Sequence, residues 1–232
     1  MRAARTNVKG HRTPAGARSA RMHPRFVVLA VFLACVALTG GGSRPDILSL
    51  VVLRPLSIAV CAWAAWTLSA QDVRRHRFAF GMMAMVIGLT LLHLVPLPPA
   101  LWQGLPGRGL VVSIDAAAGL DGTWRPISLT PPETRNALFS LFVPLAVLLL
   151  GAGLERPAIE RLLFVVIGIG LVSGLLGLLQ LVGSPTGPLF LYAHTNYGSA
   201  TGLFANRNHQ AIFLATLFPM LAALVTSRMR DG

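Results

Sequence analysis

Residues 162–182 read LLFVVIGIGLVSGLLGLLQLV, and this stretch decides the fold class. It contains no charged residue, and apolar side chains occur on nearly every side of the helix that it would form. A helix needs about 20 apolar residues to cross a hydrocarbon core, and the run is too long for a buried strand. Apolar and polar residues do not alternate, as they would in a membrane barrel. The stretch therefore predicts a helix that crosses a membrane.

Five further stretches share this apolar composition: residues 26–39, 47–70, 78–95, 137–154 and 210–226. The first is shorter than a bilayer requires, and the other four have about the necessary length. Inside lipid a chain must satisfy its own backbone hydrogen bonds, so only helices and closed barrels can span it. The sequence therefore predicts an all-α, polytopic transmembrane helical bundle of about six spans.

The composition agrees with a membrane protein. Of the 232 residues 54% are hydrophobic, and 12% are charged, which is about half the share in soluble globular proteins. The net charge is +12, from 20 Lys and Arg against 8 Asp and Glu. The arginines lie mainly before the first span and in alternate connections, which predicts both termini in the cytoplasm and contact with anionic membrane lipids. No groove-reading motif accompanies the charge, so nucleic acid is not expected as a partner.

The chain divides into two parts. Residues 1–25 form a basic cytoplasmic leader, expected to be disordered, and residues 26–232 form the transmembrane helical region. The leader and the short first apolar run also fit a secretory signal peptide, although no clear Ala-x-Ala cleavage site follows them. We favour an uncleaved first helix over cleavage, and Met22 is an alternative start. Cys35 and Cys61 lie inside apolar runs and are expected to be packing residues.

Local signals place two features of the spans. Residues 130–133, Thr-Pro-Pro-Glu, have the pattern of a capping box with proline at the first helical position, and they predict the start of the fourth span. In the fifth span, Gly170 and Gly174 lie four residues apart and would let another helix approach closely. Residues 96–135 form the longest outer connection, and the chain is expected to lie along the membrane surface there.

The connection before the last span, residues 183–209, contains one cation and no acidic residue. A helix that begins near Asn208 would direct unpaired N–H groups and the positive end of its dipole towards this connection. Arg207 adds a planar guanidinium that suits phosphate oxygens, so the arrangement favours a phosphorylated group at the outer membrane surface. In the alternative without a ligand, Asn208 caps the helix while Arg207 reaches lipid headgroups.

Other polar residues near the spans carry weaker signals. Arg54 falls inside the second apolar run, where an arginine at the bilayer centre would cost about 2.5–3.5 kcal/mol, unless the helix begins near Pro55. His93, His194 and His209 are expected to be interface residues rather than metal ligands, and neither a metal nor a cofactor is expected. No paired carboxylates lie within a span, which argues against proton-coupled transport.

Residues 202–211, Gly-Leu-Phe-Ala-Asn-Arg-Asn-His-Gln-Ala, resemble the Gly-x-Phe-x-Asn-x-Asn-x-x-Ala signature of the O-antigen ligase and polymerase family. Two weaker matches come in the expected order: residues 94–98 with Trp102, and residues 126–129 with Thr134. The resemblance covers the chain from about residue 47 to its end.

The resemblance implies a polytopic glycosyltransferase of the bacterial inner membrane that uses a polyprenyl-pyrophosphate-linked glycan as donor at the periplasmic face. The acceptor would be lipid A-core or a growing glycan, and the metal-independent reaction would invert the anomeric carbon as pyrophosphate departs. Arg207 is carried over as a pyrophosphate contact, with Asn206 and Asn208 shaping the loop. Arg54 and Arg135 are added as further substrate-binding residues.

This sequence departs from the family in its second half. Family members have more spans and a large outer loop, in which a histidine is expected to act as the base. The chain ends before such a loop, so no catalytic residue is assigned, and the chain is expected to be an amino-terminal portion without transferase activity alone. Two alternatives remain: a small permease-like transporter, and a non-catalytic membrane partner of a glycan-assembly complex.

Overall fold

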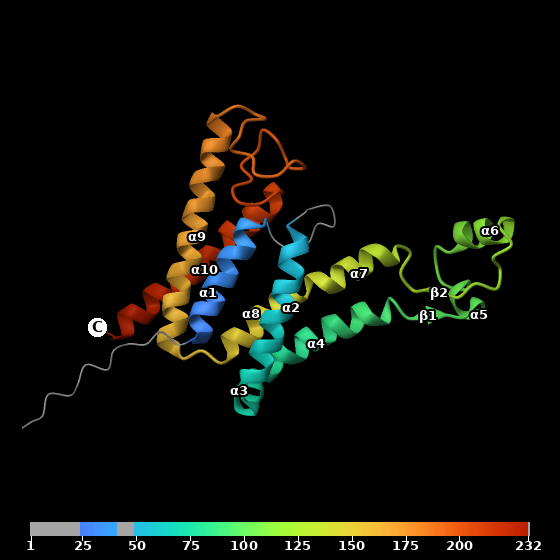
Figure 1. Ribbon diagram of the computed structural model, residues 1–232, viewed down its shortest axis with the longest axis horizontal. Coiled ribbons are helices and arrows are strands. Elements are labelled where there is room, and N and C mark those ends of the chain that lie inside the picture. The colour runs from blue at the N-terminus through green and yellow to red at the C-terminus, as the bar shows by residue number, and fades with distance from the viewer. Residues whose placement is uncertain (1–23, 41–48, 232) are drawn as a thin grey trace, which may run out of the picture.

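The computed structural model describes residues 24–40 and 49–231, and these ranges are mostly helical. All six apolar stretches predicted from the sequence form helices (Figure 1). Four helical segments are long and apolar enough to cross a membrane, and two apolar helices are shorter. The four are Leu50–Thr67, Pro131–Ala152, Arg156–Val182 and Arg207–Met229. The prediction of a mainly helical fold with helices that could cross a membrane is confirmed to this extent, and the number of six spans stays a prediction.

The third apolar stretch gives a shorter helix than expected, because regular helix ends at Leu92, before Pro96. Figure 1 labels the elements in chain order: α1 (Pro24–Leu38), α2 (Leu50–Thr67), α3 (Ala70–Arg75), α4 (Arg77–Leu92), β1 (Pro96–Leu97), α5 (Pro99–Trp102), α6 (Gly109–Ala117), β2 (Arg125–Pro126), α7 (Pro131–Ser140), α8 (Phe142–Ala152), α9 (Arg156–Val182) and α10 (Arg207–Asp231). Helices α4 and α7 run together away from α9 towards a small lobe that contains α5, α6 and both strands (Figure 1).

The core lies where α1, α2, α8 and the start of α9 meet. Leu29 of α1, Leu53 of α2 and Leu150 of α8 are at most 1% exposed. In lipid such a core is stabilised mainly by close packing, since the surrounding chains are as apolar as the side chains themselves. Helix α1 is therefore an integral part of the bundle, although it is one of the two shorter apolar helices.

The start of the fourth apolar segment is where the sequence predicts it, but the capping box is wrong. Helix α7 begins at Pro131, and Thr130 makes no side-chain capping bond. Instead, Ser128 Oγ accepts a bond from the backbone N–H of Thr130 and lies 2.6 Å from Thr134 Oγ1. Prolines at the first two helical positions offer no N–H, so few donors remain for a cap to satisfy.

This segment also breaks in the middle, between α7 and α8. Pro144 lies in the first turn of α8, so the carbonyl of Ser140 receives no helical bond from that position. Helix α7 accordingly ends at Ser140. The interruption lets α7 follow α4 towards the lobe while α8 packs against α2 (Figure 1).

The boundary of the predicted leader is corrected by two residues. Helix α1 begins at Pro24, and Arg25 is 7% exposed rather than part of a disordered segment. The Arg25 guanidinium donates to the carbonyl oxygen of Thr67, the last residue of α2, where the negative end of the helix dipole lies. Gly153 makes room for it, because a Cβ there would overlap the guanidinium. Residues 1–23 of the predicted leader lie outside the described residues.

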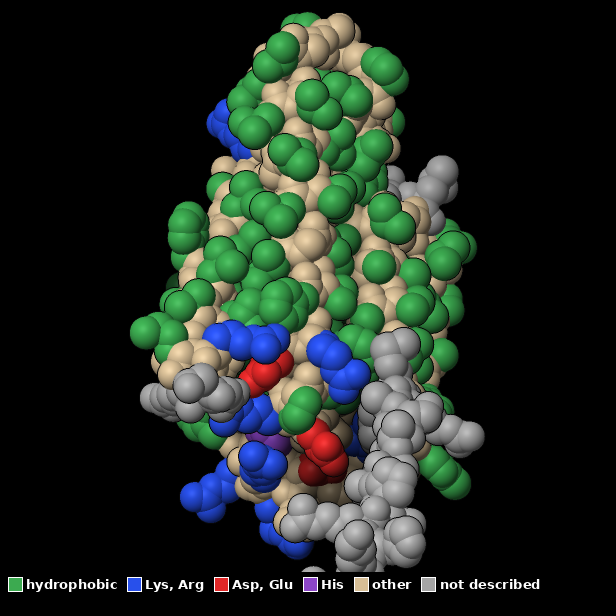
Figure 2. All heavy atoms as spheres, turned by 90° about the vertical axis from the view of Figure 1, so that its left-hand side faces the viewer, with side chains coloured by type: hydrophobic (Ala, Val, Ile, Leu, Met, Phe, Trp, Pro, Cys, Tyr) green, Lys and Arg blue, Asp and Glu red, His purple; other side chains and the backbone are tan. Residues whose placement is uncertain are grey.

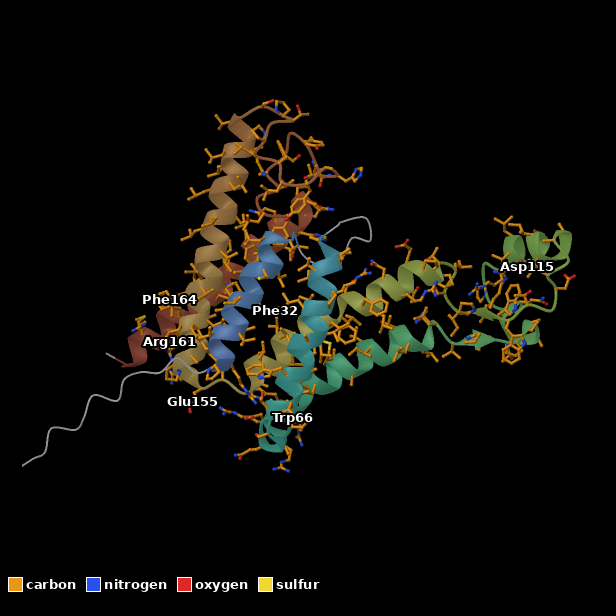
Figure 3. All side chains as sticks on the ribbon, viewed as in Figure 1. Phe32, Trp66, Asp115, Glu155, Arg161 and Phe164 are labelled. Carbon is orange, nitrogen blue, oxygen red and sulfur yellow. The ribbon has the colours of Figure 1, made fainter. Side chains whose placement is uncertain are left out.

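One end of the bundle gathers the segments that the sequence assigns to the cytoplasmic side. Trp66, Glu155 and Arg161 lie at this end (Figure 3), and Arg228 of α10 returns to it, 5.8 Å from the ring of Phe164. Figure 2 shows arginine and acidic side chains collected there, next to a surface of hydrophobic side chains. This distribution is typical of a helical bundle whose apolar belt faces lipid. The side of the membrane on which each terminus lies stays a prediction.

Candidate functional site

The connection between α9 and α10 is folded back onto α9 by one buried amide, that of Gln180. Its Oε1 accepts from the backbone N–H groups of Thr201 and Gly202, at 2.9 and 2.8 Å, and from the Thr201 hydroxyl at 3.1 Å. Its Nε2 donates to the carbonyl oxygens of Leu189 and Gly202. Because Gln180 is 1% exposed, each of these bonds replaces water that the site excludes. Gln180 therefore sets the path of the whole connection.

A second buried contact joins the connection to the start of α10. Ser173 Oγ accepts from the backbone N–H of Leu203 at 3.0 Å and donates to Gln210 Oε1 at 2.6 Å. Gly202 lies against Ser173 with a φ of +57°, and a Cβ there would be 2.5 Å from the Ser173 carbonyl oxygen. Both the left-handed backbone and the close approach require glycine at this position. The family-like segment 202–211 is thus anchored by α9.

The start of α10 corrects the predicted capping. The helix begins at Arg207, and the cap is Asn206, whose Oδ1 accepts from the backbone N–H of Asn208 at 2.8 Å. The backbone N–H of Arg207 donates to Asn196 Oδ1 at 3.1 Å. The expected unpaired N–H groups at these two positions are therefore occupied by side-chain amides. The guanidinium of Arg207 is therefore the main charged donor that remains for an anion at this helix end.

The Arg207 side chain is exposed, and its guanidinium has no hydrogen-bond or ionic partner within residues 24–40 and 49–231. It lies at the rim of a groove of about 510 Å³ between α9 and α10. The rest of the lining is apolar or glycine except for Gln210, which is 2% exposed. The Gln210 Nε2 atom is buried and has no partner among the described residues. Two nitrogen donors and an apolar wall therefore meet at one end of this groove.

The glycines of α9 form the floor of the groove and allow α10 to pack closely. A Cβ at Gly170 would lie 2.2 Å from Leu217 of α10, and one at Gly174 would lie 3.7 Å from Leu214. The predicted close approach of another helix at these positions is confirmed, and that helix is α10. The small side chains also leave the space that Leu171, Leu175 and other apolar residues enclose.

Tyr192 connects the same region to α1. Its hydroxyl donates to the carbonyl oxygens of Leu38 and Leu203, each 3.1 Å away. Burial raises the pKa of Tyr192 above its ordinary value. Gly40, with a φ of +72°, passes so close that a Cβ there would lie 2.6 Å from the tyrosine ring. The end of the first helix is therefore part of the support of the candidate site.

The structure does not bring the other two predicted binding residues to Arg207. Arg54 lies inside α2, which begins at Leu50. The helix therefore does not begin near Pro55, and its start does not leave the charge of Arg54 outside the helix. Its Nη2 donates to Asn136 Oδ1 of α7, and its Cζ lies 5.6 Å from the ring of Phe139. Arg54 Nε is buried without a hydrogen-bond partner among the described residues. Arg54 thus links α2 to α7, and Arg135 is an exposed residue of α7.

The three histidines that the sequence analysis considered, His93, His194 and His209, do not line the groove between α9 and α10. His93 Nδ1 lies 2.7 Å from the carbonyl oxygen of Leu89, one turn earlier in α4. His194 and His209 are exposed. In the part of the chain that the structure describes, no group of three His, Cys, Asp or Glu side chains could hold a metal ion.

Sequence reasoning missed Gln180, Asn196 and Tyr192, which hold the connection in place. A signal existed for Gln180, because an amide in an apolar span is costly unless it is bonded. The other two lie in an irregular connection, where sequence spacing gives no contact. Comparison with family models, curated proteins and solved structures finds no match to this chain. The resemblance of residues 202–211 to the ligase and polymerase family therefore stays a prediction.

Proposed function

We propose that this chain binds a polyprenyl-pyrophosphate-linked glycan and takes part in its transfer, as an O-antigen ligase or polymerase does. The observation that carries the proposal is the position of Arg207 at the rim of an apolar groove between α9 and α10. The resemblance of residues 202–211 to the family signature supports it independently. The acceptor would be lipid A-core or a growing glycan.

The groove suits the lipid part of such a donor. Its volume of about 510 Å³ lies within the usual range of about 300–1,000 Å³ for small-molecule sites. Its wall is formed mainly by leucine and glycine residues of two helices that are long and apolar enough to cross a membrane, so an acyl chain in the groove would contact apolar side chains. A polyprenyl chain would occupy the groove near its pyrophosphate end and continue into the bilayer.

The rim suits the charged part. A guanidinium binds phosphate oxygens through two parallel N–H bonds, and its charge is kept at every physiological pH. Stabilising negative charge that develops on a departing pyrophosphate would lower the barrier to glycan transfer. The buried Nε2 of Gln210 is a second donor at the same end of the groove. Asn206 and Asn208 act indirectly, because their bond fixes the first turn of α10.

We place the chain in the inner membrane of a bacterium, with residues 183–206 on the periplasmic face and both termini in the cytoplasm. The support is the arginine distribution, together with the gathering of α3 and the α8–α9 turn at the opposite end (Figure 1). Reporter fusions test this topology: a fusion at Ser184 should report periplasm, and one at Gly232 should report cytoplasm. A cytoplasmic signal at Ser184 would contradict the proposed site.

Binding to defined lipids tests the function. The purified chain in phosphatidylcholine nanodiscs should bind radiolabelled undecaprenyl pyrophosphate more tightly than undecaprenol. Charge-assisted hydrogen bonds contribute about 1.5–3 kcal/mol, so Arg207→Ala should weaken pyrophosphate binding about 10- to 100-fold. Undecaprenol binding should change little, because it depends on the groove. Ala211→Phe, which fills the groove, should weaken binding of both lipids.

A matched control is Arg74→Ala, which removes an exposed arginine of α3 at the opposite end of the bundle. It should leave both affinities unchanged. Equal loss in Arg74→Ala and Arg207→Ala would indicate general electrostatic attraction. If Arg207→Ala still bound undecaprenyl pyrophosphate more tightly than undecaprenol, the proposal would be contradicted. The small transporter and the non-catalytic membrane partner would then be the remaining alternatives.

A further inference from the structure

The lobe between α4 and α7, residues 96–130, is a small folded unit. Strands β1 and β2 pair antiparallel, with Pro96 opposite Pro126 and Leu97 opposite Arg125. Trp102 is fully buried at the centre, and its indole N–H donates to the carbonyl oxygen of Thr123 at 3.0 Å. The lobe therefore has a fixed inside and outside, and its surface can be read as the surface of a folded domain.

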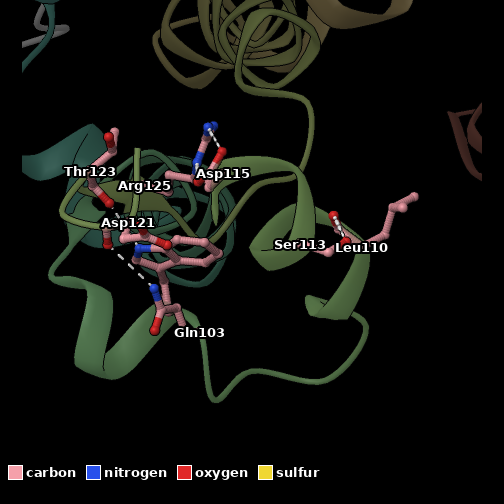
Figure 4. A network of polar contacts seen from close by, with 8 residues as sticks. Gln103, Leu110, Ser113, Asp115, Asp121, Thr123 and Arg125 are labelled. Atoms are coloured by element: carbon pink, nitrogen blue, oxygen red, sulfur yellow. Dashed lines mark hydrogen bonds and ion pairs between the residues drawn. The ribbon is translucent and has the colours of Figure 1, made fainter. Parts of the chain in front are cut away.

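The charged groups of the lobe point inwards. Asp115 of α6 is 1% exposed and forms a bidentate ion pair with the guanidinium of Arg125, which also lies 5.9 Å from the Trp102 ring (Figure 4). The pair raises the pKa of Arg125. Arg108 is 4% exposed and donates to the carbonyl oxygens of Pro126 and Ile127.

Several large apolar side chains of the lobe, in contrast, are exposed. Leu110 and Ile114 are separated by four residues on α6 and so share one face of this helix, and they are 72% and 56% exposed. Asp115 occupies the inner face of the same helix. Three more large apolar side chains are at least 60% exposed: Leu101, Trp124 and Leu129.

This arrangement is the reverse of that in a water-soluble domain, where ionised side chains lie outside and apolar ones inside. The lobe contains four charged residues in all, and Asp121 is the one that is exposed and outside the inward-facing set. Contiguous exposed apolar residues mark a binding surface for protein or membrane. The near absence of outward charge and the exposed tryptophan favour a membrane over a protein partner.

The position in which the lobe is attached also favours a membrane as its partner. The backbone N–H of Ser128 donates to the carbonyl oxygen of His93 at 2.9 Å, so the lobe is fastened directly to the end of α4. Figure 1 shows it beside the bundle, level with α9 rather than beyond the upper end of that helix. Helices α4 and α7 thus hold the lobe where an apolar exterior would meet lipid.

We propose that the outer apolar surface of the lobe, which includes Leu101, Leu110, Ile114, Trp124 and Leu129, inserts into the bilayer at the boundary between headgroups and acyl chains. Its partner is phospholipid, and the inward ion pairs spare the lobe the cost of placing charge in that layer. The lobe would then fix the tilt of α4 and α7 relative to the rest of the bundle. This proposal does not depend on the activity of the chain.

Fluorescence of Trp124 tests the insertion. The full chain is reconstituted in phosphatidylcholine vesicles that contain lipids brominated at the 6,7 or the 11,12 positions, and the emission of Trp124→Phe is subtracted from that of the wild type. The Trp124 component should fall at least twofold with the shallow bromines and less with the deep ones. Aqueous acrylamide should quench it weakly. Strong acrylamide quenching without quenching by brominated lipid would overturn the proposal.

A double variant, Leu110→Asp with Ile114→Asp, supplies the second measurement. It should keep the circular dichroism of the wild type in detergent, because both side chains are exposed, and it should lose most of the quenching by brominated lipid. Asp121→Ala is the control and should keep the quenching. A Trp124 component that neither bromine nor acrylamide reaches, at any dilution of protein in lipid, would show a second copy on this face and also overturn the proposal.

Discussion

The α9–α10 connection and the α4–α7 lobe place their charged side chains in opposite ways. The connection is held by neutral amide and hydroxyl bonds from Gln180 and Ser173, and it leaves its cation, Arg207, exposed. The lobe turns its arginines inwards onto Asp115 and backbone carbonyls, and it leaves its leucines exposed. The exposed cation supports the proposed anionic ligand, and the exposed apolar surface supports the proposed contact with lipid.

The largest expected effect is that of a substitution at Gly202, which lies in the α9–α10 connection against Ser173. In Gly202→Ala a Cβ meets the carbonyl oxygen of Ser173, and the residue keeps a positive φ, so we expect a loss of unfolding free energy on the order of 3 kcal/mol. The measurement is denaturant unfolding of the detergent-solubilised chain. Gly198→Ala is the control, since Gly198 has a φ of +69° and nothing within 4 Å. It should lose only about 1 kcal/mol; equal losses would mean that the contact with Ser173 does not constrain the connection.

A smaller effect is expected from a substitution in the lobe, which should destabilise the lobe and leave the rest of the molecule unchanged. Asp115→Asn removes the charge that pairs with Arg125, and we expect about 2 kcal/mol of local destabilisation, because Arg125 is partly solvated. Limited proteolysis should cut within residues 96–130 faster than in the wild type. Binding of undecaprenyl pyrophosphate should stay unchanged, since the groove lies between α9 and α10. Equal loosening of both regions would show that they are one cooperative unit.

The smallest effect concerns Tyr192 and depends on pH. Tyr192→Phe removes a bond to Leu38 and Leu203, so the variant should be about 1 kcal/mol less stable at neutral pH. Because burial raises the pKa of Tyr192, this advantage of the wild type is complete below the ordinary tyrosine pKa of about 10. It is lost as pH rises through the higher folded-state value.

Unfolding curves at neutral and alkaline pH measure this difference. Tyr197→Phe is the matched control, because Tyr197 is an exposed tyrosine of the same connection whose hydroxyl bonds only within that connection. It should show a smaller loss at neutral pH. A wild-type advantage over Tyr192→Phe that does not decline at high pH would contradict the role given to the phenol.

The sequence predicted the helices well because their signal is local. An uncharged run without alternation, such as residues 162–182, can satisfy its backbone hydrogen bonds in lipid only as a helix. Pro131 favours a helix start because its ring fixes φ and it has no N–H to donate. The details that failed depend on neighbours: Asn206 caps α10 in place of Asn208, and Arg25 belongs to α1 because α2 offers it a carbonyl. The break at Ser140 had a local cause in Pro144, and the long apolar run concealed it.

The candidate site divides in the same way. Segment 202–211 was found from its residues, and the helix that begins there follows from its composition. The residues that bind this segment, Gln180 and Asn196, were not found. Their contacts depend on how an irregular connection folds, and no sequence periodicity predicts such contacts. The separation of Arg54 and Arg135 from Arg207 is likewise a matter of which helices pack together.

What the sequence by itself determined is which stretches form helices and which of these helices are apolar enough to cross a membrane, since both follow from the free energy of placing each stretch in water or lipid. What only the tertiary structure decided is which polar groups are already satisfied. Hydrogen bonding and burial are relations between distant residues, so they show that Arg207 is unpaired among the described residues and that Asp115 is paired, although both are charged residues in connections between apolar spans.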